Sequence, residues 1–273
     1  MTNEAFKTEI NKLAGLIAGA RHGIALTGAG VSTLSGIRDF RGKNGLYKEM
    51  NAEKIFDIDY FFQDPSFYYQ AARSFIYNLP EKEASIVHTT LGALEERGCL
   101  KGVITQNIDL LHQKGGSRRV IEVHGSPSVH YCRRCSDPGE VEALSIAKPS
   151  GALNRDDLMG IDEVIPIVKA GEMPRCKRCQ TVLKPAITFF GENLPYRALR
   201  EAQNAARSAD LMLVLGTSLT VHPAAGIPEI TLRSGGRIVI VNNMATPLDS
   251  GAAMRFDELE PVFSALWEQF GQR

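Results

Sequence analysis

A short apolar run breaks into a glycine-rich string near the start of the chain, and this change constrains the fold more than any other feature. The run Ile24–Thr27 is followed by Gly28-Ala29-Gly30, and the small residues continue to Gly42. Such a change is typical of a parallel strand whose following turn presents backbone N–H groups to a phosphate. The common dinucleotide fingerprint is incomplete, because Thr33 stands where its third glycine belongs. The string therefore predicts a nucleotide pocket of a different kind.

Apolar runs and helical periodicities alternate along most of the chain. Near-continuous apolar runs predict parallel strands buried on both faces, and apolar residues three and four apart predict amphipathic helices between them. We expect strands at 24–27, 102–105, 120–123, 210–215 and 237–241, and helices at 6–17, 84–97, 195–209, 223–233 and 257–270, the last capped by Asp257. This alternation predicts an α/β fold with a doubly wound, Rossmann-like parallel sheet.

An aromatic-rich stretch interrupts this alternation between residues 43 and 83. Within it, Asp64 and Pro65 are typical of a helix start, with the carboxylate as cap and proline at the first helical position. The aromatic residues from Tyr47 to Tyr69 indicate a helical insertion with a small core of its own, in preference to a dedicated ligand site.

Four cysteines form two Cys-x-x-Cys pairs, Cys132 with Cys135 and Cys176 with Cys179. Four thiolates at this spacing suit one tetrahedral zinc ion and leave no open position for a substrate. The predicted Zn²⁺ is therefore structural and holds a small module of its own. A redox dithiol and an iron–sulfur cluster are the alternatives.

Basic residues around the two cysteine pairs also leave open a zinc ribbon that binds nucleic acid. Only Tyr131 is placed among them for stacking on a base. The whole chain has 31 Lys and Arg against 31 Asp and Glu, so its formal net charge is zero. A balanced chain has no general attraction to nucleic acid or to an anionic membrane, and we expect neither partner.

Polar side chains follow two of the expected strands at their carboxyl ends. Gln106, Asn107 and Asp109 come after 102–105, and His124 comes after 120–123. Doubly wound sheets bind ligands at this edge, and a neutral histidine there can take a proton from a hydroxyl. Taken alone, Asn-x-Asp at a strand end is more often a turn or a helix cap, and a lone histidine is more often structural. These residues alone leave both interpretations open.

Five motifs, in this order, resemble those of the sirtuins, the NAD-dependent protein-lysine deacylases. The motifs are the glycine string at 28–42, Thr105–Asp109, Glu122–Gly125, the two cysteine pairs, and Lys184–Glu192. The resemblance covers nearly the whole chain and is to the prokaryotic-type catalytic core. Arg38, where the family usually has proline, and Ala186, in place of a polar residue, depart from the family pattern, and we expect them to affect rate and affinity.

The resemblance implies specific roles for residues of this chain. It implies catalytic roles for His124, Asn107 and Gln106. An acyl-lysine peptide would add by backbone pairing beside a strand at Phe190, Gly191 and Glu192. The residues implied to bind NAD⁺, which is consumed, are Gly28, Ala29, Gly30, Thr33, Asp39, Phe40, Arg41, Gln106, Asn107, Ile108, Asp109, Gly216, Thr217, Ser218, Asn242 and Phe256.

The resemblance also implies a division of the chain into three parts. The NAD-binding domain would comprise 1–42, 84–125 and 186–273, and the zinc module would comprise 126–185. Residues 43–83 would form a cofactor loop and the helical module. The segment 136–175 between the cysteine pairs is longer than sirtuins commonly carry.

The implied reaction removes an acyl group from lysine. The acyl oxygen displaces nicotinamide from C1′ of the ribose, and His124 then acts as general base on a ribose hydroxyl that attacks the carbon of the resulting amidate. Water completes the transfer. The products are nicotinamide, free lysine and O-acyl-ADP-ribose. Succinyl-removing sirtuins carry a Tyr-x-x-Arg pair, and the nearest candidates here, Tyr69 and Arg73, stand one residue too far apart. Ala72 and Phe75 occupy the equivalent places, so we expect an uncharged acyl group, acetyl first.

Two other classes of function remain open from the sequence. One is a mono-ADP-ribosyltransferase or NAD hydrolase that uses the same pocket. The other is a zinc-dependent interaction protein with a vestigial pocket.

The compartment is predicted from what the termini and apolar runs contain. The first seven residues are polar and lack a signal-peptide core, and the longest strongly apolar run, Leu211–Leu215, is far too short to span a bilayer. We therefore expect a cytoplasmic protein, with a monomer favoured.

Overall fold

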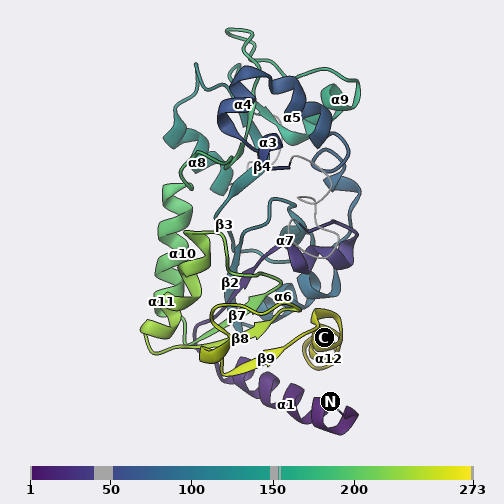
Figure 1. Cartoon of the computed structure of the whole chain (residues 1–273), viewed down its shortest axis with the longest axis vertical. Coiled ribbons are helices and arrows are strands. Elements are labelled where there is room, and N and C mark those ends of the chain that lie inside the picture. Colours follow the sequence, from purple (N-terminus) through teal and green to yellow (C-terminus); the bar gives the residue numbers. More distant parts are fainter. Residues whose placement is uncertain (1, 40–51, 148–152, 154, 272–273) are drawn as a thin grey trace. The chain divides into compact units, whose positions relative to one another are not determined.

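A computed structural model describes residues 2–39, 52–147, 153 and 155–271 (Figure 1). Its contacts divide the chain into two compact units. Unit 1 comprises Met1–Asp39, Glu83–Val123 and Leu199–Arg273, and unit 2 comprises Phe40–Lys82 and His124–Ala198. The three-part division expected from the sequence stays a prediction. In the part of the chain that the structure describes, no helix has the length and apolar character needed to cross a membrane.

Unit 1 is built on a six-stranded parallel sheet. Its strand order is β3-β2-β1-β7-β8-β9. The strands are β1 Gly23–Thr27, β2 Leu100–Thr105, β3 Val120–Glu122, β7 Leu211–Leu215, β8 Arg237–Val241 and β9 Met254–Phe256. Thr27 at the end of β1 pairs with Thr105 on one side and Leu215 on the other. The chain order reverses between β1 and β7, and doubly wound sheets bind ligands outside the carboxyl ends of the strands at this point.

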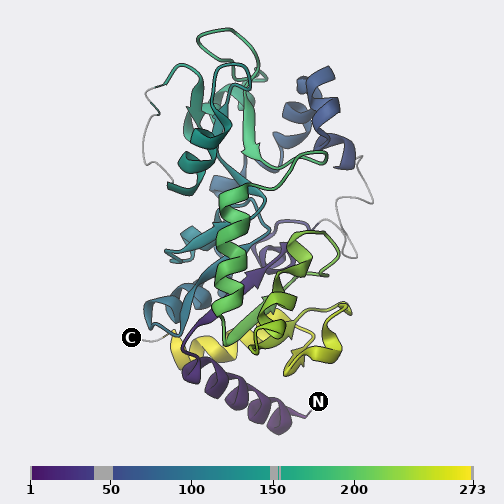
Figure 2. The same cartoon turned by 90° about the vertical axis from the view of Figure 1, so that its left-hand side faces the viewer.

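Helices cover both faces of the parallel sheet. On one face, α1 (Asn3–Gly19), α6 (Ile86–Glu96) and α12 (Leu259–Phe270) pack on a core that includes Leu213, and Figure 2 shows α1 in purple beside α12 in yellow. Met212 points to the opposite face, where Thr231 of α11 (Ile227–Arg233) contacts it and donates to Ala206 of α10 (Tyr196–Ser208). The predicted doubly wound fold is confirmed. Shorter helices of this unit are η1 Ala29–Ser35, α7 Leu111–Lys114, η3 Ala224–Gly226 and η4 Asp249–Gly251.

The predicted cap of the last helix is wrong. Helix α12 begins at Leu259 behind Glu258, whose side chain makes no capping hydrogen bond. Asp257 instead pairs with Arg255 of β9, a strand that the sequence analysis did not predict. The helix starts one residue later than expected, so Asp257 lies before the cap position, where its carboxylate reaches Arg255.

Unit 2 contains a three-stranded antiparallel sheet and the helices around it. The strand order is β5-β4-β6, and Tyr131 of β4 lies opposite Lys184 of β6. Asp64 accepts a hydrogen bond from Ser66 N at 3.1 Å, which confirms the predicted helix start. The elements are α3 Ala52–Ile55, α4 Ile58–Gln63, α5 Pro65–Ala72, η2 Leu79–Glu81, β4 Gly125–Tyr131, α8 Pro138–Ala147, β5 Leu158–Gly160, α9 Ile161–Lys169 and β6 Lys184–Ile187.

The aromatic stretch forms a core within unit 2, and one ring of that core comes from another segment. The rings of Phe56, Phe61 and Tyr68 lie 5.8, 5.4 and 5.2 Å from the ring of Phe189. Phe189 follows β6 and is 1% exposed. The helical insertion therefore shares its core with the segment that the sequence analysis assigned to substrate binding.

A buried histidine caps the start of α6 in unit 1. His88 is fully buried, and the Ser85 backbone N–H donates to its Nδ1 at 3.1 Å, which requires an unprotonated nitrogen there. Burial lowers the pKa of His88 to about 4, although the carboxylate of Asp109 acts in the opposite direction.

We predict that His88 makes the fold sensitive to acid. The unfolded chain protonates this ring near pH 6.5, whereas the folded protein holds it neutral down to about pH 4. The contribution of His88 to the free energy of unfolding is therefore complete above pH 6.5 and decreases toward pH 4. At about pH 5 the loss is about 2 kcal/mol. The variant His88→Gln keeps an acceptor at this capping position and does not titrate, so it should lose about 2 kcal/mol less than wild type between about pH 7.5 and pH 5 in urea unfolding.

The exposed His22→Gln variant is the control, and it should follow wild type. An equal loss in His88→Gln and wild type would contradict this prediction.

Candidate functional site

Two glycine turns pack main chain against main chain at the carboxyl edge of the parallel sheet. Gly28 and Gly30 follow β1, and Gly216 follows β7. The Gly30 N–H donates to the Gly216 carbonyl at 2.9 Å, and a Cβ on Gly30 would lie 2.7 Å from Gly216 Cα. Gly216 has φ +59°, and a Cβ there would lie 2.6 Å from the Val31 nitrogen. Both turns therefore require glycine, and they give this edge a backbone surface of the kind that binds phosphates.

Three buried polar side chains form a chain of hydrogen bonds at the same edge. Asn107 Nδ2 donates to the Gly28 carbonyl and to Ser32 Oγ, both at 3.1 Å. Ser32 Oγ in turn donates to Asp109 Oδ2 at 2.6 Å. The other oxygen of Asp109 accepts from Leu111 N at 3.0 Å. Both amide hydrogens of Asn107 are committed, so its oxygen is the group that can accept a hydrogen bond from a ligand.

Gln106 joins the turn after β2 to the turn after β7. Its Nε2 donates to Thr217 Oγ1 at 3.0 Å, and its backbone N–H donates to the Thr27 carbonyl at 3.0 Å. Beneath it, Thr27 Oγ1 lies 2.8 Å from both Thr105 Oγ1 and His112 Nε2. The edge thus combines bare backbone with amide, hydroxyl and carboxylate groups, and this donor set fits the phosphates, ribose and carboxamide of a dinucleotide.

The remaining predicted cofactor residues of unit 1 differ in how accessible they are. Thr33 is exposed, whereas Ala29, Asp39, Ile108 and Ser218 are half-buried. Asn242 follows β8, is 4% exposed and donates from Nδ2 to the Met244 carbonyl at 2.8 Å. Phe256 is 6% exposed and belongs to the apolar core beside α12. Phe40 and Arg41 lie outside the described residues, and the assignment of all these residues to NAD⁺ stays a prediction.

His124 lies in unit 2, directly before β4. Its carbonyl accepts a hydrogen bond from Thr188 N at 2.8 Å. The next residue, Gly125, has φ +75°, and a Cβ there would lie 2.2 Å from the Ala186 carbonyl oxygen. Glycine therefore allows a tight turn after the half-buried histidine. This contact anchors His124 beside the segment that leads to Phe190.

Phe190 is held on both sides by the helical module. Its N–H donates to the Phe56 carbonyl at 2.7 Å, and its carbonyl accepts from Ile58 N at 3.1 Å. Among the described residues, the main-chain groups of Gly191 and the carbonyl of Glu192 have no hydrogen-bond partner. A peptide that adds here by backbone pairing would therefore use Gly191 and Glu192, and it would not use the main chain of Phe190.

The four paired cysteines converge in unit 2. Their sulfur atoms all lie within 4.8 Å of one another, and Cys132 Sγ is 3.4 Å from Cys179 Sγ. Tetrahedral zinc with bonds of about 2.3 Å would place the sulfurs about 3.8 Å apart, so the cluster fits one ion. Hydrogen bonding by the Thr181 hydroxyl and backbone lowers the pKa of Cys179 to about 6. Burial raises the pKa of Cys132, and the hydrogen bond with Cys179 raises that of Cys135.

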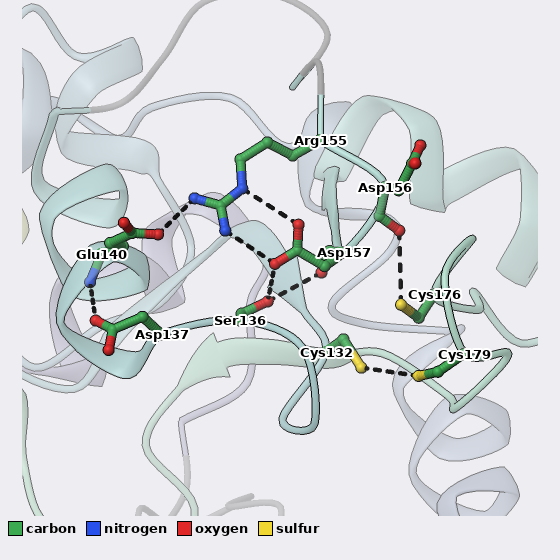
Figure 3. A network of polar contacts seen from close by, with 9 residues as sticks. All are labelled: Cys132, Ser136, Asp137, Glu140, Arg155, Asp156, Asp157, Cys176 and Cys179. Carbon is green, nitrogen blue, oxygen red and sulfur yellow. Dashed lines mark hydrogen bonds and ion pairs between the residues drawn. The ribbon is translucent and has the colours of Figure 1, made fainter.

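The long segment between the cysteine pairs supports both of them (Figure 3). The Asp157 carbonyl accepts from Cys132 N at 2.9 Å, and the Asp156 carbonyl accepts from Lys177 N at 2.8 Å. Arg155 donates to both carboxylate oxygens of Asp157, at 3.2 and 2.9 Å, and Ser136 Oγ donates to one of them at 2.8 Å. These hydrogen bonds lower the pKa of the buried Asp157 carboxyl, with Arg155 as the main cause. Arg155, Asp156 and Asp157 therefore hold both cysteine pairs in position, and we call these three residues the brace.

This chain is similar to known proteins both in sequence and in structure. The model of the Sir2 family matches residues 28–223. An NAD-dependent protein deacetylase of Thermotoga maritima is 43% identical over 242 residues, which cover 89% of this chain and 90% of the relative. An NAD-dependent protein deacylase of Thermococcus kodakarensis is 39% identical over 227 residues, which cover 83% of this chain and 82% of the relative.

The chain belongs to the Sir2 family.

Solved Sir2 structures share nearly the whole fold of this chain. A complex of Sir2 with a p53 peptide and NAD⁺ has a TM-score of 0.80 and 39% identity, with 96% of this chain and 98% of that chain covered. A Sir2 structure bound to a propionylated peptide has a TM-score of 0.79 and 37% identity, with 96% and 99% covered. The resemblance to sirtuins that the motifs indicated is confirmed.

Several residues of this Sir2 chain were missed by the sequence analysis. Ser32 was read only as part of the glycine string, although it links Asn107 to Asp109. The brace at Arg155 and Asp157 gave no signal, because charged residues in a long segment are usually solvated. Lys184 stands directly before a proline inside an apolar stretch. A charge at such a place is unusual, and this was the one signal in the sequence that Lys184 could be buried with a partner.

We predict that Arg155 controls how firmly this Sir2 chain holds zinc. Arg155→Ala leaves the buried Asp157 carboxylate with Ser136 as its remaining side-chain donor and loosens the carbonyls that orient both cysteine pairs. Zinc transfer to a chromogenic chelator should become about tenfold faster or more, the range typical for partners of metal ligands. Arg178→Ala changes an exposed residue of the second cysteine pair and is the matched control. Equal release rates for the two variants would rule out the brace.

Proposed function

We propose that this Sir2 chain is an NAD-dependent protein-lysine deacetylase whose products are nicotinamide, free lysine and O-acetyl-ADP-ribose. The observation that carries this proposal is the hydrogen-bonded set of Asn107, Ser32 and Asp109 beside the two glycine turns. Relatives that cover most of the chain are named NAD-dependent protein deacetylases and deacylases. The substrates would be acetylated lysines in proteins or peptides.

The carboxyl edge of the parallel sheet would hold the dinucleotide. The backbone turns at Gly28–Gly30 and Gly216–Ser218 would bind the phosphates, and Asn107 Oδ1 would accept a hydrogen bond from the nicotinamide ribose. Asp109 is fixed by Ser32 and Leu111, so its remaining lone pairs could accept from the nicotinamide amide. Bound NAD⁺ supplies an electrophilic ribose carbon and the hydroxyls that receive the acyl group. Further cofactor contacts are assigned to Thr33, Asp39, Phe40, Arg41, Gln106, Ile108, Thr217, Asn242 and Phe256.

His124 would be the general base. A neutral imidazole can take a proton from a ribose hydroxyl and hold it until the acyl transfer is complete. Its backbone contact with Thr188 ties it to the segment that would carry the peptide. The acyl-lysine peptide would pair with the main chain of Gly191 and Glu192, beside the exposed ring of Phe190.

One zinc ion would be held by the four cysteines as a structural ion. With four protein ligands the ion would have no open position, so its role would be to stabilise unit 2. All five cysteines are free thiols, and four of them form this cluster. Thiolate ligands persist in a reducing environment, and this supports a cytoplasmic location.

The test follows both nicotinamide and peptide mass when the purified protein is incubated with an acetyl-lysine peptide, with and without NAD⁺. Loss of acetyl should require NAD⁺ and match nicotinamide release. His124→Ala should lower kcat by about 100-fold or more, the usual contribution of a general base. The exposed His22→Ala variant should keep wild-type activity. Nicotinamide release without loss of acetyl would instead indicate NAD hydrolysis or ADP-ribosyl transfer.

We predict a preference for acetyl over succinyl peptides. Ala72 is fully buried and has no donor, and the Tyr69 hydroxyl already donates to the Leu183 carbonyl at 2.6 Å. At the places of Ala72 and Phe75 a succinyl carboxylate would meet no side-chain hydrogen-bond donor, which lowers kcat/KM by about tenfold or more. Competition between acetyl and succinyl forms of one peptide measures the ratio. A clear preference for succinyl would contradict the assignment of Ala72 and Phe75.

A further inference from the structure

The turn Phe189–Glu192 is closed both by its main chain and by a side chain. Glu192 N donates to the Phe189 carbonyl at 3.0 Å, and Phe189 N donates back to Glu192 Oε2 at 2.9 Å. Between them Gly191 has φ +92°, which is the conformation that the third position of a type II turn requires. The Glu192 carboxylate therefore points into its own turn.

A buried lysine, Lys184, forms an ion pair with the same oxygen of the Glu192 carboxylate. Lys184 is 2% exposed, and its Nζ lies 2.8 Å from Glu192 Oε2. The ammonium also donates to the carbonyls of Ile187 at 2.7 Å and Pro185 at 3.2 Å, and it lies 4.2 Å from the centre of the Phe189 ring. Burial lowers the pKa of Lys184 to about 8, and the charge of Glu192 opposes this shift. All three ammonium hydrogens of Lys184 thus have an acceptor, as a buried charge requires.

The second carboxylate oxygen of Glu192 faces the first cysteine pair. Arg133, which stands between Cys132 and Cys135, has its Nη1 3.6 Å from Glu192 Oε1. The Arg133 guanidinium also lies 4.7 Å over the ring of Phe62 in α4. Arg133 is partly exposed, so its ion pair is weaker than the buried one. Glu192 nevertheless connects the turn to the cysteine cluster through one side chain.

We propose that Glu192 is a positioning residue for the acyl-lysine peptide and that Lys184 and Arg133 hold it in place. This inference rests on the proposed function. The main-chain groups of Phe190 are already bonded to Phe56 and Ile58, so pairing with a peptide falls to Gly191 and Glu192. The Glu192 carboxylate bonds to Phe189 N and to Lys184 Nζ, and these contacts fix the main chain of Gly191 and Glu192. Peptide affinity therefore depends on the Glu192 carboxylate and, through Arg133, on an intact cysteine cluster.

The first experiment separates peptide binding from catalysis. Anisotropy of a fluorescein-labelled acetyl-lysine peptide gives its Kd, and steady-state kinetics give KM and kcat. Glu192→Gln keeps an acceptor for Phe189 N but loses both ion pairs, so Kd and peptide KM should rise about tenfold, while kcat and the KM for NAD⁺ change less than about threefold. Glu172→Gln, at an exposed position of unit 2, is the matched control and should leave all four values unchanged.

The second experiment tests the connection to the cysteine cluster and does not depend on the buried pair. Arg133→Ala should raise the peptide Kd about threefold, whereas Arg134→Ala, its exposed neighbour in the same cysteine pair, should not. Since Arg133 acts through Glu192, the double variant with Glu192→Gln should bind no more weakly than Glu192→Gln alone. Zinc content and thermal melting, measured for every variant, show that the fold is retained.

The outcomes distinguish the two proposals. A wild-type protein that binds no acetyl peptide and removes no acetyl group would overturn the proposed function. A wild-type protein that binds peptide, together with a folded Glu192→Gln variant that binds it equally well, would overturn the positioning role alone. A loss in kcat with unchanged Kd would also overturn it, because Glu192 would then act on the reaction itself.

Discussion

The contact between the two glycine turns is the constraint on which the parallel-sheet unit depends. Gly30 and Gly216 approach so closely that neither can carry a Cβ, and their hydrogen bond joins the turn after β1 to the turn after β7. Because the strand order reverses between these strands, the turns mark the place where the sheet opens toward a ligand. The side chains of Asn107, Ser32 and Asp109 then add directional polar groups to a surface that is otherwise backbone. The lack of side chains at Gly30 and Gly216 allows the close approach of the two turns, and the three side chains supply the hydrogen-bonding groups for a ligand.

Unit 2 is organised by charges that are enclosed by hydrogen bonds. Arg155 and Asp157 hold the carbonyls that orient both cysteine pairs, and Lys184 and Glu192 hold the turn that follows β6. In a small module with a limited apolar core, such pairs fix particular loops in particular positions. The zinc ligands and the proposed peptide turn are therefore connected through a few side chains, with Arg133 between them.

The sequence predicted those parts of the molecule that depend on local pattern. Apolar runs gave β1, β2, β7 and β8, and the spacing of Cys132, Cys135, Cys176 and Cys179 gave the cluster. Strand β9 has only three residues and no apolar run, and therefore gave no signal in the sequence. Its pairing with β8 defines it as a strand. The predicted cap of α12 was wrong because the helix starts one residue later, behind Glu258, and Asp257 pairs with Arg255 instead. The role of Lys184 depends on a partner eight residues away in the chain. Tertiary partners of this kind leave no periodic signal.

The central claim is that NAD⁺ binds where the glycine turns meet, and calorimetric titration of NAD⁺ into glycine variants tests it most directly. Gly30→Ala places a methyl group against Gly216, whereas Gly15→Ala in α1 meets nothing within 4 Å and is the control. We predict that Gly30→Ala weakens NAD⁺ binding by about tenfold or more while zinc content is retained, and that Gly15→Ala binds like wild type. Wild-type affinity in Gly30→Ala would contradict the account.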